Sequence, residues 1–241
     1  DAITLDLEDG VVAERNAQAR GLVKAAIAPS AQGAAEVFVR VNKAYLQADL
    51  EASVWPGVSG IMLPQVESAA EVVQAAEMVT ALERQRGMVA GSLCFIVLLE
   101  SALGVWNIRA IVTVSPRVTQ VGLDESDLAA DLKIDPLPEY DPFVYARGRL
   151  VIEAIAARVN PVGMAYPLSV HTRGASAPEI HSLATKARNL GMKGAICPYP
   201  DWVAPVNAAF TPTAELVAYN KRVREAFAAG VAAGTAAVPL D

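Results

Sequence analysis

The sequence is poor in the residues that mark several common classes of protein. It has only two cysteines, Cys94 and Cys197, which fit no disulfide or zinc framework, so we expect two reduced thiols. No apolar run reaches about 18 residues, so we expect no membrane span, and the first residues form no signal peptide. Lys and Arg are scattered and the formal net charge is −6, which argues against a nucleic-acid partner. We therefore expect a cytoplasmic protein.

The apolar content is high although aromatic residues are scarce. Hydrophobic residues make up 53% of the chain and aromatic residues 6%, so Ala, Val, Leu and Ile supply most of the apolar surface. This composition is typical of buried parallel strands with covering helices. A chain of 241 residues is also typical of one α/β barrel, and it can bury roughly 70% of its unfolded surface.

Short β-branched segments alternate along the chain with longer helical patterns. We predict strands at 3–7, 37–41, 61–66, 94–99, 118–123, 164–170 and 195–197. We predict helices at 14–28, 46–52, 68–86, 103–112, 144–158, 178–190 and 213–233, and a loop rich in Asp and Pro at 131–142. Ser68 and Glu71 have the spacing of a capping box, which predicts a helix start at this point.

The repeated order of strand and then helix predicts parallel strands joined by right-handed crossovers. A doubly wound sheet is the alternative, but no G-x-G-x-x-G motif follows a strand. The chain opens without methionine inside a strand pattern, so we expect that earlier residues, including the first strand, are missing. The pattern favours a (β/α)₈ barrel over residues 1–212, followed by a C-terminal helical tail at 213–241.

In such a barrel the active site lies at the carboxyl ends of the strands. The polar residues that end the apolar runs are Asp6, Glu8, Asp9, Arg40, Asn42, Gln65, Glu67, Glu100, Asp124, Glu125, Asp127 and His171. Clustered carboxylates repel one another unless they are protonated or bridged by a cation. Because no Cys/His ligand set is present, we expect a hard ion such as Mg²⁺, which Glu100 and Asp127 could hold. Arg40 could then bind a substrate carboxylate through a bidentate fork.

Each of these residues also has a structural interpretation. A glutamate at a strand end can cap a helix or pair with a cation, and the acidic residues at 124–127 can form a solvated loop. Arg40 can simply neutralise Glu8 or Asp9. We interpret His171 as structural and Cys197 as a packed thiol, because no basic partner for the thiol is evident. Taken alone, the residues leave these alternatives open.

Seven motifs occur in a fixed order along nearly the whole chain. They are LDLEDGV at 5–11, AR at 19–20, VRVN at 39–42, GIMLPQVES at 60–68, LLESALGV at 98–105, PRVTQVGLDESDLAADL at 116–132 and VNAAFTPT at 206–213. Together they resemble the citrate lyase β-subunit-like branch of the HpcH/HpaI aldolase superfamily, which includes malyl- and citramalyl-CoA lyases. The resemblance implies a (β/α)₈ barrel of the phosphoenolpyruvate/pyruvate-binding type and a Mg²⁺-dependent lyase that acts on thioesters.

The resemblance implies a pair of metal ligands. Glu100 matches the glutamate ligand in the family's L-I-E-T-A motif, and Asp127 matches the aspartate ligand in its G-x-x-D-L motif. Asp127 follows Arg117 by ten residues, as the ligand follows the equivalent arginine in the family. We therefore assign Glu100 and Asp127 to the metal.

Further roles follow from the same resemblance. Arg40 matches the arginine that holds the carboxylate of the acid, and Glu8 and Asp9 match an acidic pair at the rim of the pocket. We assign Arg40, Glu8 and Asp9 as candidate catalytic residues. Pro64 and Asp124 join Arg40 as candidate substrate-binding residues.

The sequence departs from the family pattern in four places. Asp124 stands where the family has glycine, Gln65 replaces the lysine of L-P-K, and Asn16 replaces a lysine of the first helix. The family's G-K…I-H/N-P segment reads GAICP at 194–198. Three of the four changes remove a cation or add an anion near an anionic substrate, whereas the metal pair and Arg40 are intact.

The implied reaction is cleavage of a 2-hydroxy-acyl-CoA thioester, malyl-, citramalyl- or citryl-like, to acetyl-CoA and an oxoacid. Glu8 or an acidic residue on a tail that crosses from a neighbouring subunit is the candidate for moving the proton. The tail implies a homo-oligomer, with a trimer favoured. Three alternatives remain: a thioesterase on the same site, a carrier-protein-dependent or non-catalytic citrate lyase β-like subunit, and a class II-type aldolase acting on free sugar-derived oxoacids.

Overall fold

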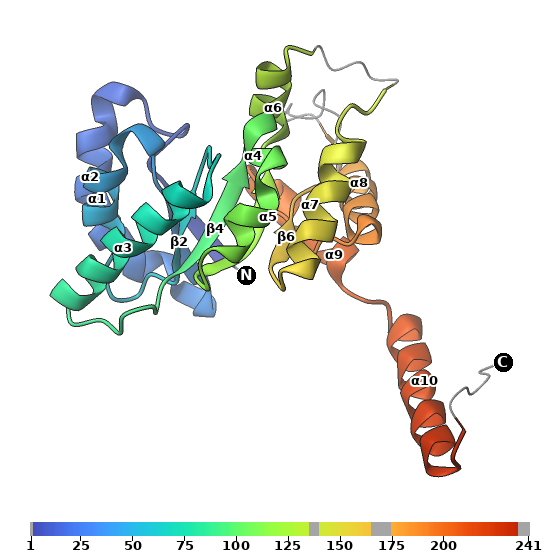
Figure 1. The fold of residues 1–241 in the computed structure, drawn as a ribbon. Helices are drawn as coiled ribbons and strands as arrows, with labels where there is room; N and C mark the ends of the chain where they lie inside the picture. Colours follow the sequence, from blue (N-terminus) through green and yellow to red (C-terminus); the bar gives the residue numbers. More distant parts are fainter. Residues whose placement is uncertain (1, 135–139, 165–174, 236–241) are drawn as a thin grey trace.

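The structure, a computed structural model, describes residues 2–134, 140–164 and 175–235. Six parallel strands lie side by side in the order in which they occur along the chain. They are β1 (Ala2–Asp6), β2 (Glu36–Arg40), β3 (Gly60–Leu63), β4 (Cys94–Leu99), β5 (Val118–Leu123) and β6 (Asn160–Val162). Beyond β6, a parallel bridge joins Val162 to Gly194. Consecutive parallel strands joined by helices are the arrangement of a (β/α) barrel, as predicted (Figure 1), and among the described residues no hydrogen bonds join the last strand back to β1.

Helices follow the strands along the chain. They are α1 (Asn16–Ser30), α2 (Leu46–Ser53), α3 (Ala69–Gln85), α4 (Ala102–Trp106), α5 (Ile108–Thr113), α6 (Glu125–Leu132), α7 (Val144–Ala156), α8 (Ala177–Leu190), α9 (Val203–Phe210) and α10 (Ala214–Ala232). The capping box at the start of α3 is confirmed, because the Ser68 hydroxyl accepts from the Glu71 amide and the Glu71 carboxylate accepts from the Ser68 amide. Within the described ranges, no helix is long and apolar enough to cross a membrane.

The helix prediction was wrong in three regions. The helix expected at 103–112 is divided into α4 and α5 at Asn107, whose side chain donates to the Glu67 carbonyl at 2.9 Å. The acidic segment that could have been a solvated loop is helix α6, which begins after the N-cap Asp124. An N-cap aspartate followed by acidic residues in the first turn satisfies and neutralises the amide end of a helix. Helix α9 was not predicted.

The strand prediction was wrong after β5. The sixth strand is β6, earlier than the predicted strand at 164–170; Met164 lies outside any strand, and residues 165–170 lie outside the described ranges. The strand expected at 195–197 does not form, and only the preceding Gly194 makes a bridge. Gly163 follows β6 with φ +153°, a backbone conformation that a strand does not continue.

Alternation along the strands divides the core into an inner and an outer part. Phe38, Met62, Ile96 and Leu98 form a small cluster of their own, while the intervening residues of the same strands pack with the helices in the main core. Successive strand residues point to opposite faces. Two residues beyond Phe38 comes Arg40, and two beyond Leu98 comes Glu100. The same alternation therefore places both polar side chains on the inner side at the carboxyl ends of their strands.

The last helix, α10, confirms the helix predicted at 213–233. Its N-cap is Thr213, whose hydroxyl accepts from the Leu216 amide at 3.1 Å. The helix extends away from the barrel (Figure 1), and Gly230 is its one buried residue.

Candidate metal and substrate site

Arg40 is the centre of an acidic cluster at the end of β2. Its Nε and Nη2 donate to the two carboxylate oxygens of Asp6 at 2.8 and 2.6 Å, in a bidentate pair. Its Nη1 lies 2.9 Å from Glu8 Oε2 and donates to Asp9 Oδ2 at 3.1 Å. These contacts agree with the alternative interpretation, in which Arg40 neutralises Glu8 or Asp9, and Asp6 is a third partner. Asp9 is 72% exposed, so its contact is the one most accessible to an incoming anion.

The segment LDLEDG at the end of β1 is shaped to present these carboxylates. Asp6 Oδ1 accepts from the Glu8 amide at 2.9 Å and Oδ2 accepts from the Gly10 amide at 2.9 Å. A Cβ atom at Gly10 would lie 2.6 Å from Asp6 Oδ2, so a larger residue here would displace the Asp6 carboxylate. Burial raises the pKa of Glu8 to about 7, and the charges of Asp9 and Asp6 add to this effect against that of Arg40.

Glu100 follows β4 and is 6% exposed. Burial raises the pKa of its carboxyl to about 8, with further contributions from the charges of Glu8, Asp124 and Asp127. A hydrogen bond from the backbone amide of Gln65 acts in the opposite direction. Four acidic groups from three strand ends therefore affect one another here, as the positions at the ends of the apolar runs predicted.

Asp124 and Asp127 lie at the start of α6. Asp124 Oδ1 accepts from the amides of Ser126 and Asp127 at 2.9 and 3.3 Å, so this carboxylate caps the helix. Asp127 is exposed in the first turn. Glu125 points elsewhere: its two oxygens accept from Arg147 at 2.5 and 2.6 Å, and both side chains are buried. The interpretation of this segment as a solvated acidic loop is therefore wrong.

The residues present fit a divalent cation. Arg40 pairs with Asp6, Glu8 and Asp9. Among the described residues it forms no ion pair with Glu100 or Asp127. Among the described residues, no three His, Cys, Asp or Glu side chains are grouped to hold a metal by themselves. Mg²⁺ in proteins usually takes one or two carboxylates and completes its shell with water and substrate oxygens. A buried glutamate with a raised pKa, near an acidic helix start, meets that requirement.

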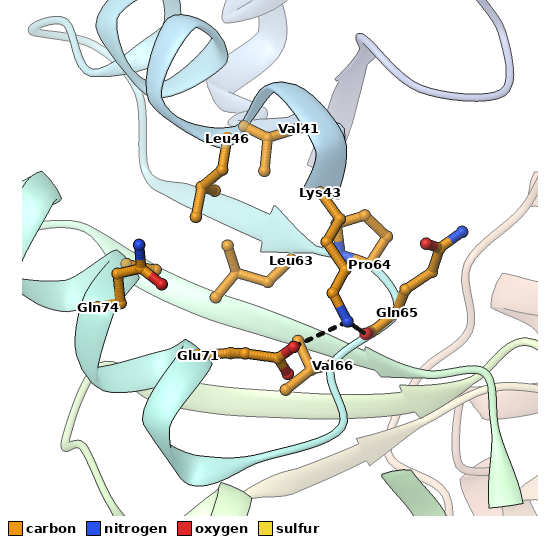
Figure 2. A pocket seen from close by; sticks show the side chains of 10 residues that line it. Val41, Lys43, Leu46, Leu63, Pro64, Gln65, Val66, Glu71 and Gln74 are labelled. Carbon is orange, nitrogen blue, oxygen red and sulfur yellow. Dashed lines mark hydrogen bonds and ion pairs between the residues drawn. The ribbon is translucent and has the colours of Figure 1, made fainter. Parts of the chain in front are cut away.

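Pro64 lines a small cavity beside this cluster (Figure 2). The cavity has a volume of about 220 Å³, and its walls are Val41, Lys43, Leu46, Leu63, Pro64, Gln65, Val66, Glu71, Gln74 and Ala75. Lys43 closes one side: its Nζ donates to the Gln65 carbonyl at 2.7 Å and lies 2.8 Å from Glu71 Oε1. The structure thus places Pro64 on a mostly apolar wall rather than among the carboxylates.

The sequence placed Gln65 and Glu67 at a strand end, but their contacts were not predicted, and Ser101 was missed. Gln65 has φ +52°, an unusual conformation for a residue with a side chain. Its backbone N–H donates to Glu100, and its backbone carbonyl accepts from Lys43 Nζ. The Ser101 hydroxyl donates to Glu67 at 2.7 Å, next to Glu100. Positive φ at a non-glycine residue has no sequence signal, whereas the Ser directly after Glu100 could have been noticed. His171 lies outside the described residues.

The two cysteines form no disulfide with each other, as expected from the sequence. Cys94 and Cys197 are both free. Burial raises the pKa of the Cys197 thiol, which packs against a second apolar cluster that includes Trp202 and Ile180. Cys197 is therefore a packed thiol, as predicted.

Proteins similar to this chain in sequence include a citrate lyase subunit beta-like protein and a malyl-CoA lyase. The chain is 32% identical over 249 residues to a citrate lyase subunit beta-like protein of Deinococcus radiodurans, covering 100% of this chain and 82% of that protein. It is 29% identical over 260 residues to an L-malyl-CoA/beta-methylmalyl-CoA lyase of Cereibacter sphaeroides, covering 98% of this chain and 80% of that one.

A solved structure shows the same fold. CitE from Mycobacterium tuberculosis, in complex with magnesium, acetoacetate and coenzyme A, superposes with a TM-score of 0.72 at 22% identity, covering 95% of this chain and 79% of that one. Residues 1–200 match the HpcH/HpaI aldolase/citrate lyase family. The chain therefore belongs to this family of carbon–carbon lyases, in its citrate lyase β-subunit-like branch.

Proposed function

We propose that the protein is a Mg²⁺-dependent lyase that cleaves a 2-hydroxy-acyl-CoA thioester, malyl-, citramalyl- or citryl-like, to acetyl-CoA and an oxoacid. The observation that carries the proposal is the buried carboxyl of Glu100, whose pKa is raised to about 8 beside three other carboxylates and which pairs with no cationic side chain among the described residues. Glu100 and Asp127 would hold the ion. When bound, Mg²⁺ supplies Lewis-acid stabilisation of the charge that develops on the oxoacid oxygen.

Arg40 has the position to bind the substrate's carboxylate. Asp6 fixes its Nε and Nη2 through two short hydrogen bonds, which leaves Nη1 as the group directed at Glu8 and the exposed Asp9. A substrate carboxylate would take the place of Asp9 at Nη1. In this role Asp6 orients the guanidinium, and Asp124 holds α6 in place as its cap.

Glu8 is the candidate for moving the proton at the acetyl carbon. Its pKa of about 7 allows it to exist in both protonation states near neutral pH, which general acid–base catalysis requires. An acidic residue from a neighbouring subunit remains the alternative. Replacing Glu8 by glutamine should lower kcat much more than it raises KM, because the substrate contacts of Arg40 would remain.

The reaction is tested by product analysis. Purified protein is incubated with Mg²⁺ and L-malyl-CoA or citramalyl-CoA, with an EDTA control, and the products are identified by mass spectrometry. Acetyl-CoA with glyoxylate or pyruvate, lost on chelation, is the expected result. Free CoA with intact malate or citramalate would instead indicate a thioesterase, and absence of turnover would favour a carrier-protein substrate or a non-catalytic subunit.

The metal ligands are tested separately from turnover. We expect Glu100→Gln to weaken Mn²⁺ binding, followed by electron paramagnetic resonance, by at least tenfold. Glu77→Gln, which changes an exposed glutamate on α3, is the matched control. Equal Mn²⁺ affinity in Glu100→Gln and Glu77→Gln would contradict the assignment of Glu100.

We further propose that residues 213–241 form a tail that contacts a second copy of the chain, in a trimer. Helix α10 exposes Leu216, Tyr219, Val223 and Phe227, which gives it an apolar surface outside the barrel. Light scattering should give a trimer for the wild-type protein and a smaller species for Phe227→Glu. A monomeric wild-type protein would contradict the proposal.

A further inference from the structure

Residues 64–68 connect β3 with α3, and they are bonded to the chain beyond the ends of both neighbouring strands. On the β2 side, the Lys43 ammonium donates to the Gln65 carbonyl at 2.7 Å (Figure 2). On the β4 side, the backbone N–H of Gln65 donates to the Glu100 carboxylate. The backbone of Gln65 therefore joins a lysine on one side to the proposed metal ligand on the other.

This backbone has a conformation that a residue with a side chain rarely adopts. The φ angle of Gln65 is +52°, in the left-handed region, which is disfavoured for a residue with a Cβ atom. Rotation to an ordinary negative φ would change the direction of the N–H relative to the carbonyl, so the two bonds could not both be kept. The bond to Lys43 and the bond to Glu100 require the same conformation, and each therefore stabilises the other.

The ammonium of Lys43 is itself held in place by the first turn of α3. Its Nζ lies 2.8 Å from Glu71 Oε1. The other oxygen of Glu71 accepts from the amides of Glu67 and Ser68 at 2.7 and 3.0 Å, and the Ser68 bond is part of the capping box. Lys43 is thus directed at the Gln65 carbonyl by a carboxylate whose own position is fixed by the start of a helix.

We propose that Lys43 is a positioning residue for the metal site. It holds the Gln65 backbone in the conformation whose N–H donates to Glu100, and this bond orients the carboxylate so that its other oxygen is left for the ion. Hydrogen bonds from outside the coordination shell commonly fix the geometry of metal ligands in this way. The proposal rests on the proposed function, because it takes Glu100 as a ligand of the metal.

The direction of the change in metal affinity separates positioning from a simple charge effect. If Lys43 acted only as a nearby positive charge, its removal would strengthen the binding of a divalent cation, because like charges repel. If it positions Gln65, Lys43→Met should weaken Mn²⁺ binding, followed by electron paramagnetic resonance, about tenfold, as for other partners of metal ligands. Lys43→Arg, which keeps a charged donor, should retain most of the affinity. Unchanged or tighter Mn²⁺ binding by Lys43→Met would overturn the proposal.

A second substitution in the Lys43→Met background tests the route through Gln65. Glycine adopts a positive φ without the steric cost of a Cβ atom. Lys43→Met/Gln65→Gly should therefore bind Mn²⁺ more tightly than Lys43→Met alone. Lys43→Met/Gln65→Ala, which also removes the side chain of Gln65 but keeps the Cβ atom, is the matched control and should not recover. Failure of glycine to restore affinity, or equal recovery with alanine, would overturn the proposal.

Hydrogen exchange of the metal-free protein, followed by NMR, tests the link without metal or turnover. The Gln65 amide should exchange faster in Lys43→Met than in the wild type, because its bond to Glu100 is lost. The Val66 amide, which donates to the Leu98 carbonyl at 3.1 Å, is the internal control and should stay protected. Equal exchange at Gln65 in both proteins, or faster exchange at both amides, would overturn the proposal. If exchange differs as expected and the wild type binds no Mn²⁺, the metal assignment of Glu100 fails and its link to Lys43 stands.

Discussion

The ion pair between Arg117 and Glu83 anchors the start of β5, at the opposite end of the strand from Asp124. Glu83 is fully buried and Arg117 is 7% exposed. The Glu83 oxygens accept from Arg117 Nη1 and Nη2 at 2.9 and 2.6 Å, and from the amides of Leu93 and Gly91 at 2.9 and 2.7 Å. Arg117→Met would leave a carboxylate buried without its counter-charge.

The size of the effect follows from the lowered pKa of Glu83 and from the behaviour of buried ion pairs in other proteins. Burial alone would raise the pKa of Glu83, but the bonds from Arg117 and from the Leu93 and Gly91 amides outweigh it and lower the pKa from 4.5 to about 2. That difference corresponds to about 3 kcal/mol of interaction in favour of the charged form. Removing one partner of a buried pair costs roughly 3–5 kcal/mol in other proteins. We therefore expect Arg117→Met to lower the free energy of unfolding by about 3–5 kcal/mol at pH 7.

Urea unfolding followed by circular dichroism measures this loss, with Arg84→Met, an exposed arginine on α3, as the control. The double variant Arg117→Met/Glu83→Met should be more stable than Arg117→Met, because no charge then remains buried. The folded pKa of Glu83 lies below the unfolded value, so its stabilisation is complete above about pH 4.5 and is lost as the pH falls toward 2. Glu83→Gln should remove this part of the acid sensitivity. A double variant no more stable than Arg117→Met would refute the reasoning.

Three further predictions concern the site. Gly10→Ala places a Cβ atom 2.6 Å from Asp6 Oδ2 and should lower kcat/KM at least tenfold while circular dichroism stays unchanged; wild-type kinetics would contradict this. Arg40→Lys loses the bidentate bond to Asp6 and should raise KM for the thioester at least tenfold; an unchanged KM would remove Arg40 from substrate binding. Glu125→Gln weakens the buried pair that joins α6, the helix that carries Asp127, to α7 and should lower Mn²⁺ affinity, measured by paramagnetic resonance, about tenfold. Equal Mn²⁺ affinity would show that this pair does not position α6.

The strands that carry the site could be predicted because they are buried on both faces. β4 and β5 have the predicted bounds, Cys94–Leu99 and Val118–Leu123, and both consist largely of apolar residues. Once these strand ends are known, Glu100 and Asp124 follow by counting. β6 was missed because it is a three-residue strand that contains Pro161, and neither feature produces a strand pattern.

The partners of the charged residues could not be predicted in the same way. Glu125 and Asp127 are two residues apart in one acidic run, yet the first is buried against Arg147 and the second is exposed. The difference arises from the helical turn of α6, which sends neighbouring side chains in different directions. Arg147 lies 22 residues further along the chain. No local pattern connects a carboxylate with a partner at that distance.

Arg40 shows how two interpretations of one residue can both hold. The sequence offered a choice between neutralising the local acids and holding a substrate carboxylate. The structure gives Arg40 two short bonds to Asp6, an ion pair with the buried Glu8 at 2.9 Å, and a contact with Asp9 at 3.1 Å that is longer and solvent-exposed. A guanidinium fixed on one side and accessible on the other is prepared for an exchange of carboxylates at Nη1. Neutralisation by Asp9 would then be the resting arrangement, and binding of the acid its replacement, so Asp9→Asn should lower rather than raise KM for the thioester.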